Sequence, residues 1–422
     1  MDTQRRKFIQ SGVMLSSGIL LNGISSCKPR TESPTERQTQ VSRMFDNIKP
    51  ITKNDRLQRL EKARSLMLES DIDAIFLESG TSLEYFTGIK WWPSERMTAC
   101  MVPKDGAPFY ICPAFEEERL RELISIEGKV RVWQEHESPF DLVVNSLKDL
   151  GISSGRIGIE ENVRFFLFDG IKNTSSTFEF VNAKPVVGKC RSIKTPAELE
   201  LMRMANEITL EAYKIGFSSL EKGMSQYDFN KIVEDAFLAL GATEKGWAGS
   251  SFGKYSAFPH GSSQPQSLKE GDIVLIDGGC KLEGYQADIT RTTVFGEPTK
   301  RQKEIWNVVK EAQSAVYEHI EAGKPCESLD AVARSVVEKA GFGTGYTNFF
   351  HRVGHGIGMD FHEWEYLVKG NKTPLTPGMC FSNEPGIYLY DEFGVRLEDC
   401  FYVTEDGYKA FTPQSPSIET PV

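Results

Sequence analysis

Five short, glycine-marked segments in the second half of the chain each carry one carboxylate or imidazole side chain. In chain order, these side chains are Asp277, Asp288, His355, Glu384 and Glu398. Four carboxylates and one imidazole are enough to hold two divalent ions side by side. A paired-metal site can make hydroxide from water near neutral pH and polarise a carbonyl, as amide hydrolysis requires.

The first two of these residues flank a predicted β-hairpin. Residues 273–276 are an apolar run bounded by glycines, which predicts a buried strand that ends at Asp277. A glycine-rich connection over residues 278–284 and a second β-rich run over residues 289–295 follow. A hairpin between the two runs would bring Asp277 and Asp288 to one place.

The other three residues also lie in segments that indicate strands or turns. His355 lies among three glycines at alternate positions, which argues against a helix and favours close backbone approach. Glu384 precedes the turn signal Pro385-Gly386, and Glu398 ends a strand signal over residues 394–397. Each motif alone has an ordinary structural explanation, but the ordered combination indicates a metal centre.

The order Asp, Asp, His, Glu, Glu within these motifs resembles the pita-bread metallopeptidase family, which includes Xaa-Pro aminopeptidase, prolidase and methionine aminopeptidase. The resemblance covers roughly residues 55–412. It implies that Asp288 and Glu398 bridge two metal ions. It also implies that Asp277 chelates one ion, and that His355 and Glu384 bind the other. Creatinase shares the fold but lacks these ligands, so the metal-free branch of the family is not expected.

Three further histidines, His260, His351 and His362, match positions that Xaa-Pro-cleaving members use around the substrate. The resemblance implies that His260 and His362 contact the substrate carbonyl or the scissile nitrogen. It also implies that His351 lies on the proline side, that Glu384 shuttles a proton, and that Arg396 steadies the ligand cluster. The expected substrate is therefore a proline-containing peptide, and the residues leave open whether the activity is that of an aminopeptidase or a dipeptidase.

The expected cofactor is a pair of divalent metal ions. Oxygen-rich ligation favours Mn²⁺, while Co²⁺, Fe²⁺ and Zn²⁺ are alternatives.

The sequence leaves two alternative functions. Residues 249–253 match the G-x-S-x-G pattern, so a serine hydrolase would use Ser251 as its nucleophile. That motif requires a strand before it and a helix after it, but residues 244–248 predict a poor strand and residues 254–261 a poor helix. The second alternative is a metal-free binding protein on the same fold, and the complete ligand set argues against it.

The N-terminus has the features of an export signal. Residues 4–10 resemble a twin-arginine motif, and the apolar stretch that follows is too short to span a membrane well. Residues 24–27 resemble a lipoprotein cleavage box, with Cys27 as the lipidated first residue of the mature chain. We therefore expect a signal peptide over residues 1–26, a flexible polar tether over residues 27–51, and a protein that is lipid-anchored at the cell envelope, on its periplasmic or surface side.

The rest of the chain is too long for one core, so two domains of an α/β (α+β) fold are expected. Alternating helix and strand signals predict an α/β domain over residues 52–187. A helix that opens at Thr195-Pro196 begins a second domain over residues 188–414, and residues 415–422 form a tail. The resemblance identifies these domains as an N-terminal creatinase-like domain and a C-terminal pita-bread catalytic domain.

Composition and aromatic content bear on partners. The net charge of −10 and the lack of a basic patch exclude a nucleic acid as an expected partner. The seven cysteines other than Cys27 show no C-x-x-C spacing and are interpreted as small buried apolar residues.

The segment around Trp91-Trp92 is unusually aromatic for a domain edge. In similar enzymes the corresponding loop helps to wall an active site, often that of a neighbouring subunit, so a homodimer with one of these tryptophans near the substrate pocket is expected.

Overall fold

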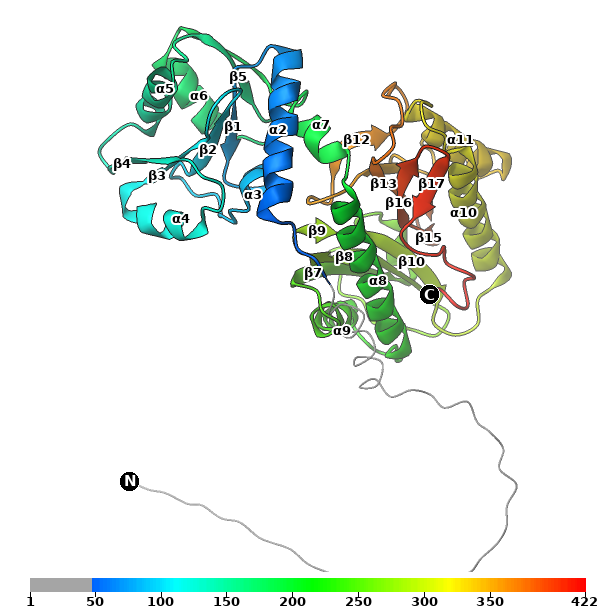
Figure 1. The fold of residues 1–422 in the computed structure, drawn as a ribbon. Coiled ribbons are helices and arrows are strands. Elements are labelled where there is room, and N and C mark those ends of the chain that lie inside the picture. Colours follow the sequence, from blue (N-terminus) through cyan, green and yellow to red (C-terminus); the bar gives the residue numbers. More distant parts are fainter. Residues whose placement is uncertain (1–47) are drawn as a thin grey trace, which may run out of the picture.

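The computed structural model describes residues 48–422, which form two domains side by side (Figure 1). The expected signal peptide over residues 1–26, Cys27 and most of the 27–51 tether lie outside the described residues and stay predictions. Within residues 48–422, no helix combines the length and the apolar character that a membrane crossing needs.

The first domain is built on a six-stranded mixed sheet with the order β4-β3-β2-β1-β5-β6. Its strands are β1 (Ala74–Glu78), β2 (Ala99–Pro103), β3 (Phe109–Pro113), β4 (Lys129–Trp133), β5 (Gly155–Ile159) and β6 (Phe178–Asn182). Its helical elements are α2 (Lys53–Ser70), α3 (Thr81–Thr87), η1 (Ala114–Glu116), α4 (Glu117–Leu123), α5 (Pro139–Asp149), α6 (Phe165–Thr174) and α7 (Val187–Ser192).

The central strand β1 packs helices on both of its faces. Successive side chains of a strand point to opposite faces, so Ile75 and Leu77 join one hydrophobic core while Phe76 joins another. The core that contains Ile75 continues into the second domain, where it includes Ile208 of α8 (Pro196–Ser218). The two domains therefore share buried apolar surface.

The second domain combines three sheets. Their strand orders are β10-β8-β7 with β9 added to β8, β12-β11-β13-β16-β17, and β14-β15. The strands are β7 (Glu244–Phe252), β8 (Ile273–Leu282), β9 (Tyr285–Gln286), β10 (Ile289–Val294), β11 (Gly354–Gly356), β12 (Glu363–Leu367), β13 (Cys380–Asn383), β14 (Gly386–Leu389), β15 (Phe393–Arg396), β16 (Asp399–Thr404) and β17 (Gly407–Ala410).

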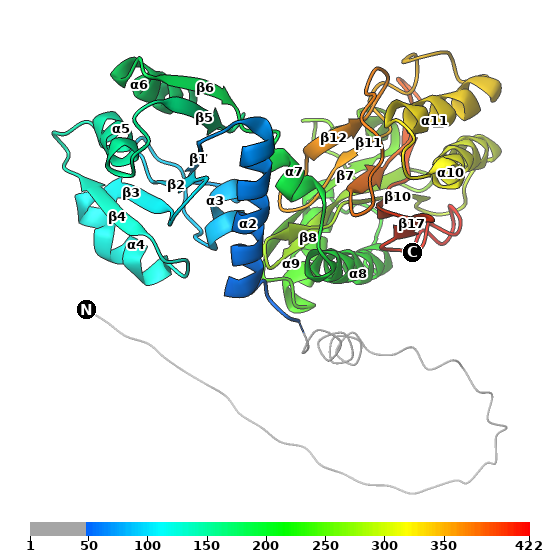
Figure 2. The same cartoon turned by 45° about the horizontal axis from the view of Figure 1, so that its top comes forward.

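Helices cover the outside of these sheets. Besides α8, they are α9 (Gln226–Ala239), α10 (Lys300–His319) and α11 (Glu327–Lys339), with a 3₁₀ turn, η2 (Gly253–Ala257), after β7. Helix α8 packs against β8, α9 against β7, and α11 against β12 (Figure 2). Helix α10 packs against β15. The start of α8 is as predicted: Thr195 is the N-cap, Pro196 lies in the first turn, and Glu198 completes a capping box with Thr195.

One strand is longer than the sequence predicts. Strand β8 does not end at Asp277 but continues to Leu282, so most of the expected glycine-rich connection is strand. The glycines serve close strand approach rather than a loop. A Cβ atom added to Gly278 would lie 2.0 Å from the Trp247 carbonyl oxygen. A Cβ atom added to Gly279 would lie 1.9 Å from the Ala287 carbonyl oxygen.

Candidate metal centre

The five predicted ligands lie within strands or directly beside strand ends, and they meet in one place. Asp277 lies within β8, Asp288 directly before β10, and His355 in β11. Glu384 follows β13, and Glu398 lies between β15 and β16. The predicted hairpin is confirmed, since β8 and β10 pair antiparallel with Thr290 opposite Asp277.

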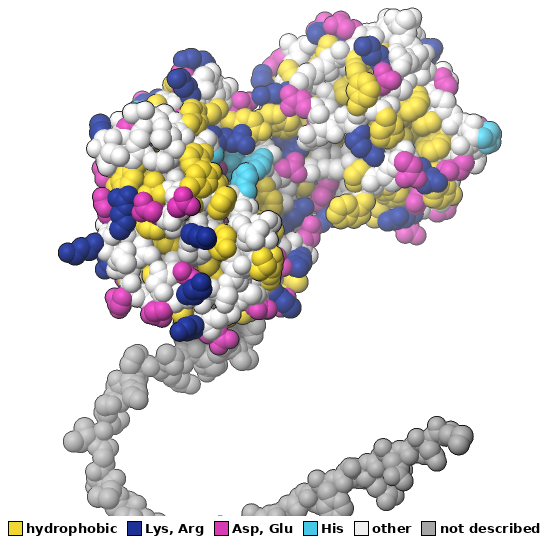
Figure 3. Space-filling view, turned by 180° about the vertical axis from the view of Figure 1, so that it is seen from behind, with side chains coloured by type: hydrophobic (Ala, Val, Ile, Leu, Met, Phe, Trp, Pro, Cys, Tyr) yellow, Lys and Arg dark blue, Asp and Glu magenta, His cyan; other side chains and the backbone are white. Residues whose placement is uncertain are grey.

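These ligands line a single cavity of about 490 Å³. All nine site residues expected from the sequence contribute to its wall: Asp277, Asp288, His355, Glu384, Glu398, His260, His351, His362 and Arg396. Histidine side chains gather in a hollow beside the junction of the two domains (Figure 3). The structure thus brings the candidate residues together, while their individual roles stay predictions.

The tightest part of the cluster joins Asp288, His355 and Glu398, whose candidate ligand atoms all lie within 4.8 Å of one another. His355 Nε2 lies 3.6 Å from Asp288 Oδ2 and 3.4 Å from Glu384 Oε1. His355 Nδ1 lies 3.0 Å from the Gly356 carbonyl oxygen, which can only accept. The Nδ1 atom therefore carries the proton, and Nε2 is left as a ligand facing the carboxylates.

The residues present fit divalent metal ions. Asp277 Oδ1 is buried and has no hydrogen-bond partner among residues 48–422, and Asp288 and Glu398 are buried beside it. Buried carboxylates need compensating charge or hydrogen-bond donors. Carboxylate oxygens are the ligands that hard divalent cations prefer.

Burial, together with the crowding of acids, shifts the pKa values of the cluster. Burial, reinforced by neighbouring carboxylates, raises the pKa of Asp288 and of Glu398 well above the usual range. Burial raises the pKa of Glu384 to about 7, with Asp277 adding to the effect and Arg396 opposing it. Burial also lowers the pKa of His355 to about 3. Metal ions would bind the ionised carboxylates, so binding would release protons.

Arg396 ties the cluster to its surroundings. Its Nη2 donates to Asp277 Oδ2 at 2.8 Å, and its Nε donates to Thr290 Oγ1 at 3.0 Å. Thr290 Oγ1 in turn donates to Glu398 Oε2 at 2.6 Å. Arg396 Nη1 also donates to the Tyr388 hydroxyl at 2.9 Å. Thr290 and Tyr388 are not among the site residues predicted from the sequence. The strand alternation that places Thr290 two residues after Asp288 was the available signal for Thr290.

The three further histidines surround the cluster at different depths. His351 Nε2 lies 2.7 Å from the Tyr388 hydroxyl, and its Nδ1 lies 2.8 Å from the Arg352 carbonyl oxygen. Burial, assisted by Arg396, lowers the pKa of His351 to about 3. The His362 ring meets the His355 ring edge-on, with centroids 4.1 Å apart. His260 and His362 are exposed to the cavity.

Aromatic residues that the sequence analysis did not single out form the outer wall. Trp247 of β7 and Phe361 line the cavity and contact each other edge-to-face, with centroids 6.5 Å apart. Trp91 and Trp92 do not line the cavity of their own chain. Trp92 is 89% exposed, and Trp91 lies under the Arg119 guanidinium at 4.6 Å. Their expected place beside a second subunit's pocket stays a prediction.

The serine-hydrolase alternative finds no support in the geometry. The expectation of a poor strand over residues 244–248 is wrong, because pairing with β8 extends β7 from Glu244 to Phe252. Ser251 is buried inside that strand, opposite Leu275, and not at a strand-to-helix turn.

The seven cysteines among the described residues are all free and buried, as predicted.

A cluster of buried carboxylates and one imidazole is the kind of ligand set that metal-dependent hydrolases use. Comparison with known proteins agrees. Residues 200–405 match the model of metallopeptidase family M24, and residues 59–193 match the creatinase/prolidase N-terminal domain. The chain belongs to metallopeptidase family M24. The predicted family and fold are therefore confirmed, and the metal-free binding-protein alternative is not supported.

Individual relatives span nearly the whole of the described chain. An Xaa-Pro dipeptidase from Lactobacillus helveticus is 34% identical over 84% of this chain and 96% of its own length. The structure of a prolidase from Thermococcus sibiricus superposes with a TM-score of 0.79 at 28% identity, over 85% of this chain and 97% of that one. An X-Pro aminopeptidase from Thermotoga maritima superposes with a TM-score of 0.70 at 28% identity, over 81% and 96%.

The raised pKa of Glu384 predicts how the stability of the metal-free protein depends on pH. Between pH 4.5 and about 7, Glu384 is protonated in the folded state but ionised in the unfolded state. Stability contributed by this group is therefore present below pH 4.5 and is lost as the pH rises through about 7. We expect the melting temperature of chelator-treated protein to fall across this window, and expect saturating Mn²⁺ to reverse the fall.

Differential scanning fluorimetry at several pH values, with and without metal, measures this effect. Glu384→Gln is the matched control, because it keeps the shape of the side chain and removes its titration. A metal-free melting temperature that rises across the window in the wild type would contradict the assignment.

Proposed function

We propose that this protein hydrolyses the Xaa-Pro bond in dipeptides or at the N-terminus of short peptides, with the help of two divalent metal ions. The observation that carries the proposal is the cavity in which five metal-type ligands and three further histidines converge. Full-length similarity to relatives named Xaa-Pro dipeptidase and prolidase supports the same substrate class.

The proposed ligand roles are those that the resemblance to the family implies. Asp288 and Glu398 would bridge the two ions, Asp277 would chelate one, and His355 and Glu384 would hold the other. Metal ions bound there would supply hydroxide from water and polarise the substrate carbonyl. Oxygen-rich ligation favours Mn²⁺, with Co²⁺, Fe²⁺ and Zn²⁺ as alternatives.

The remaining side chains would handle protons and orientation. Glu384, which lines the cavity beside the other ligands, would accept a proton and return it to the leaving proline nitrogen. His260 and His362 would donate hydrogen bonds to the substrate carbonyl or the scissile nitrogen. His351, held by Tyr388, would face the proline side. Arg396 would keep Asp277 in its orientation.

A kinetic variant tests the role of His362. His362→Ala should lower kcat on an Xaa-Pro peptide by roughly 10²-fold, because a proton-transfer or transition-state contact is lost. The metal content should not change, since His362 is not proposed as a ligand. His136→Ala, on the exposed surface of the first domain, is the matched control and should keep wild-type kinetics. Wild-type kinetics in His362→Ala would remove this residue from the mechanism.

The substrate class itself is tested by comparing Gly-Pro with a longer X-Pro peptide. We expect cleavage of Gly-Pro, because relatives named dipeptidase span 84% of this chain. Exclusive cleavage of the longer peptide would assign the aminopeptidase activity instead. Failure to cleave either peptide with Mn²⁺ present would contradict the proposed function.

We further propose export and lipid anchoring, on the basis of the N-terminal sequence alone. Replacing Arg5 and Arg6 with lysine should retain the precursor in the cytoplasm. Cys27→Ala should abolish lipid attachment. Fractionation and mass spectrometry measure both effects, and full-length unmodified wild-type protein in the cytosol would contradict the proposal.

We also propose a homodimer in which Trp92 is covered by a second subunit. A tryptophan that is 89% exposed leaves a large apolar surface in water. Light scattering should therefore report twice the mass of one chain. The monomeric mass, together with unchanged kinetics in a Trp91→Ala, Trp92→Ala double variant, would contradict this arrangement.

A further inference from the structure

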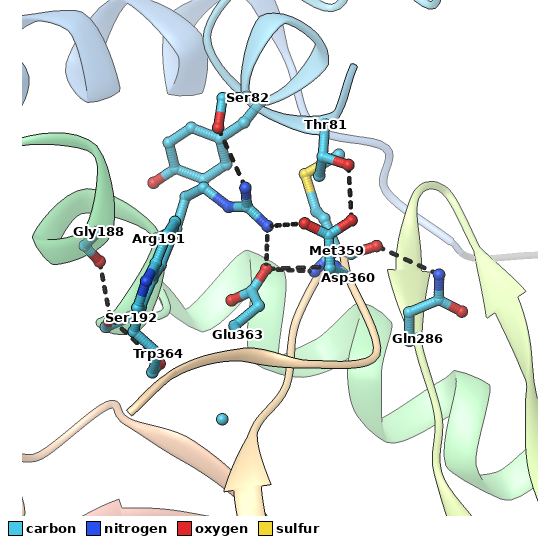
Figure 4. Close-up of polar contacts among 12 residues, drawn as sticks. Thr81, Ser82, Gly188, Arg191, Ser192, Gln286, Met359, Asp360, Glu363 and Trp364 are labelled. Carbon is cyan, nitrogen blue, oxygen red and sulfur yellow. Dashed lines mark hydrogen bonds and ion pairs between the residues drawn. The ribbon is translucent and has the colours of Figure 1, made fainter. Parts of the chain in front are cut away.

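A short loop, residues 357–362, joins β11 to β12 and carries Phe361 and His362 to the wall of the cavity. Glu363, the first residue of β12, binds the backbone of this loop. Its Oε1 accepts the backbone N–H groups of Met359 at 3.0 Å and Asp360 at 3.3 Å (Figure 4). The position of His362 therefore depends on what fixes its two neighbours, Asp360 and Glu363.

The guanidinium of Arg191, which lies outside the catalytic sheets, binds both Asp360 and Glu363. Arg191 lies in α7, which leads from the first domain to the second, and its side chain is 1% exposed. Its Nη2 donates to Glu363 Oε1 at 2.5 Å and to Asp360 Oδ2 at 2.6 Å. Its Nη1 donates to Ser82 Oγ of α3 at 3.0 Å (Figure 4).

The first domain also contacts the loop directly. Thr81 Oγ1, at the start of α3, donates to Asp360 Oδ1 at 2.6 Å (Figure 4). Asp360 thus accepts one hydrogen bond from Thr81 and one from Arg191. The first domain and the loop are joined through both oxygens of one carboxylate.

Charge keeps Glu363 able to accept all of its donors. Lys194 Nζ lies 3.0 Å from Glu363 Oε2, opposite the Arg191 contact. Burial would raise the pKa of Glu363, but Arg191 and Lys194 together lower it to about 2. An ionised Glu363 is an acceptor at both oxygens. Its Oε1 accepts from the two loop amides and Arg191, and its Oε2 accepts from Lys194.

We propose that Arg191 is a positioning residue, which fixes the 357–362 loop through Asp360 and Glu363 and thereby sets His362 over the metal cluster. The first domain, through Arg191 and Thr81, then completes the active site of the second domain. Because His362 acts on the substrate only in the proposed function, the catalytic part of this inference rests on that function.

A second buried arginine provides a matched control. Arg59 of α2 is 5% exposed and also joins the two domains. It donates to the Tyr285 hydroxyl at 2.7 Å and lies 3.1 Å from Glu198 of α8. Arg59 contacts neither the 357–362 loop nor the cavity. Arg59→Met therefore removes a buried interdomain ion pair of similar kind without the positioning contacts.

The test compares Arg191→Met, Arg191→Lys, Thr81→Val and Arg59→Met in the metal-loaded full chain. We expect Arg191→Met to lower kcat on Gly-Pro by about 10²-fold, as misplacement of a catalytic group by about 1 Å does. KM and metal content should change little. Amide hydrogen exchange of residues 357–362 should accelerate. Arg191→Lys should restore part of kcat, and Arg59→Met should leave both kcat and loop exchange near wild type.

Two results would overturn the proposal. One is an equal loss of kcat in Arg191→Met and Arg59→Met, and the other is unchanged loop exchange in Arg191→Met. If Arg191→Met does not fold, Thr81→Val decides, with faster loop exchange and a several-fold lower kcat expected. Loop exchange is read without substrate. If the wild type cleaves no Xaa-Pro peptide, the proposed function fails, while the exchange data still support or overturn the positioning of the loop.

Discussion

Four carboxylates converge in one largely buried cavity, and the arrangement of the second domain depends on how their charge is balanced. Arg396 contacts Asp277 directly and reaches Glu398 through Thr290. Arg352 also lines the cavity, but two guanidinium groups cannot neutralise four ionised acids, and each uncompensated buried charge costs several kcal/mol. In the metal-free state the acids respond by retaining protons, as the raised pKa values of Asp288 and Glu398 indicate. Bound divalent ions would remove that need, so metal binding and the stability of this region are expected to be linked.

The same principle of paired buried charge operates at the domain junction. Arg191 and Lys194 surround Glu363, and Arg59 lies beside Glu198. These pairs lie next to a hydrophobic core that continues from the first domain into α8. The junction is therefore held by specific buried contacts, which suits an element that fixes a loop at the edge of the cavity. A mobile, solvated linker would leave the position of His362 undefined.

Local sequence patterns predicted much of the fold and all nine candidate site residues. Glycine-bounded apolar runs predicted the hairpin that joins Asp277 to Asp288, and a Thr-Pro start predicted α8. The sequence could not predict β7, because its strand state comes from pairing with β8 and not from its own composition. For the same reason β8 continues through Gly278, where another strand lies too close for any side chain.

Long-range contacts explain what else was missed. Tyr388 contacts His351, 37 positions away, and Arg191 contacts Glu363, 172 positions away. No local pattern marks such contacts.

The central claim, that these carboxylates hold two metal ions, is tested most directly by elemental analysis of purified wild type and Asp288→Ala. Two divalent ions per wild-type chain and the loss of at least one in the variant are predicted. Two ions retained in folded Asp288→Ala would contradict the account.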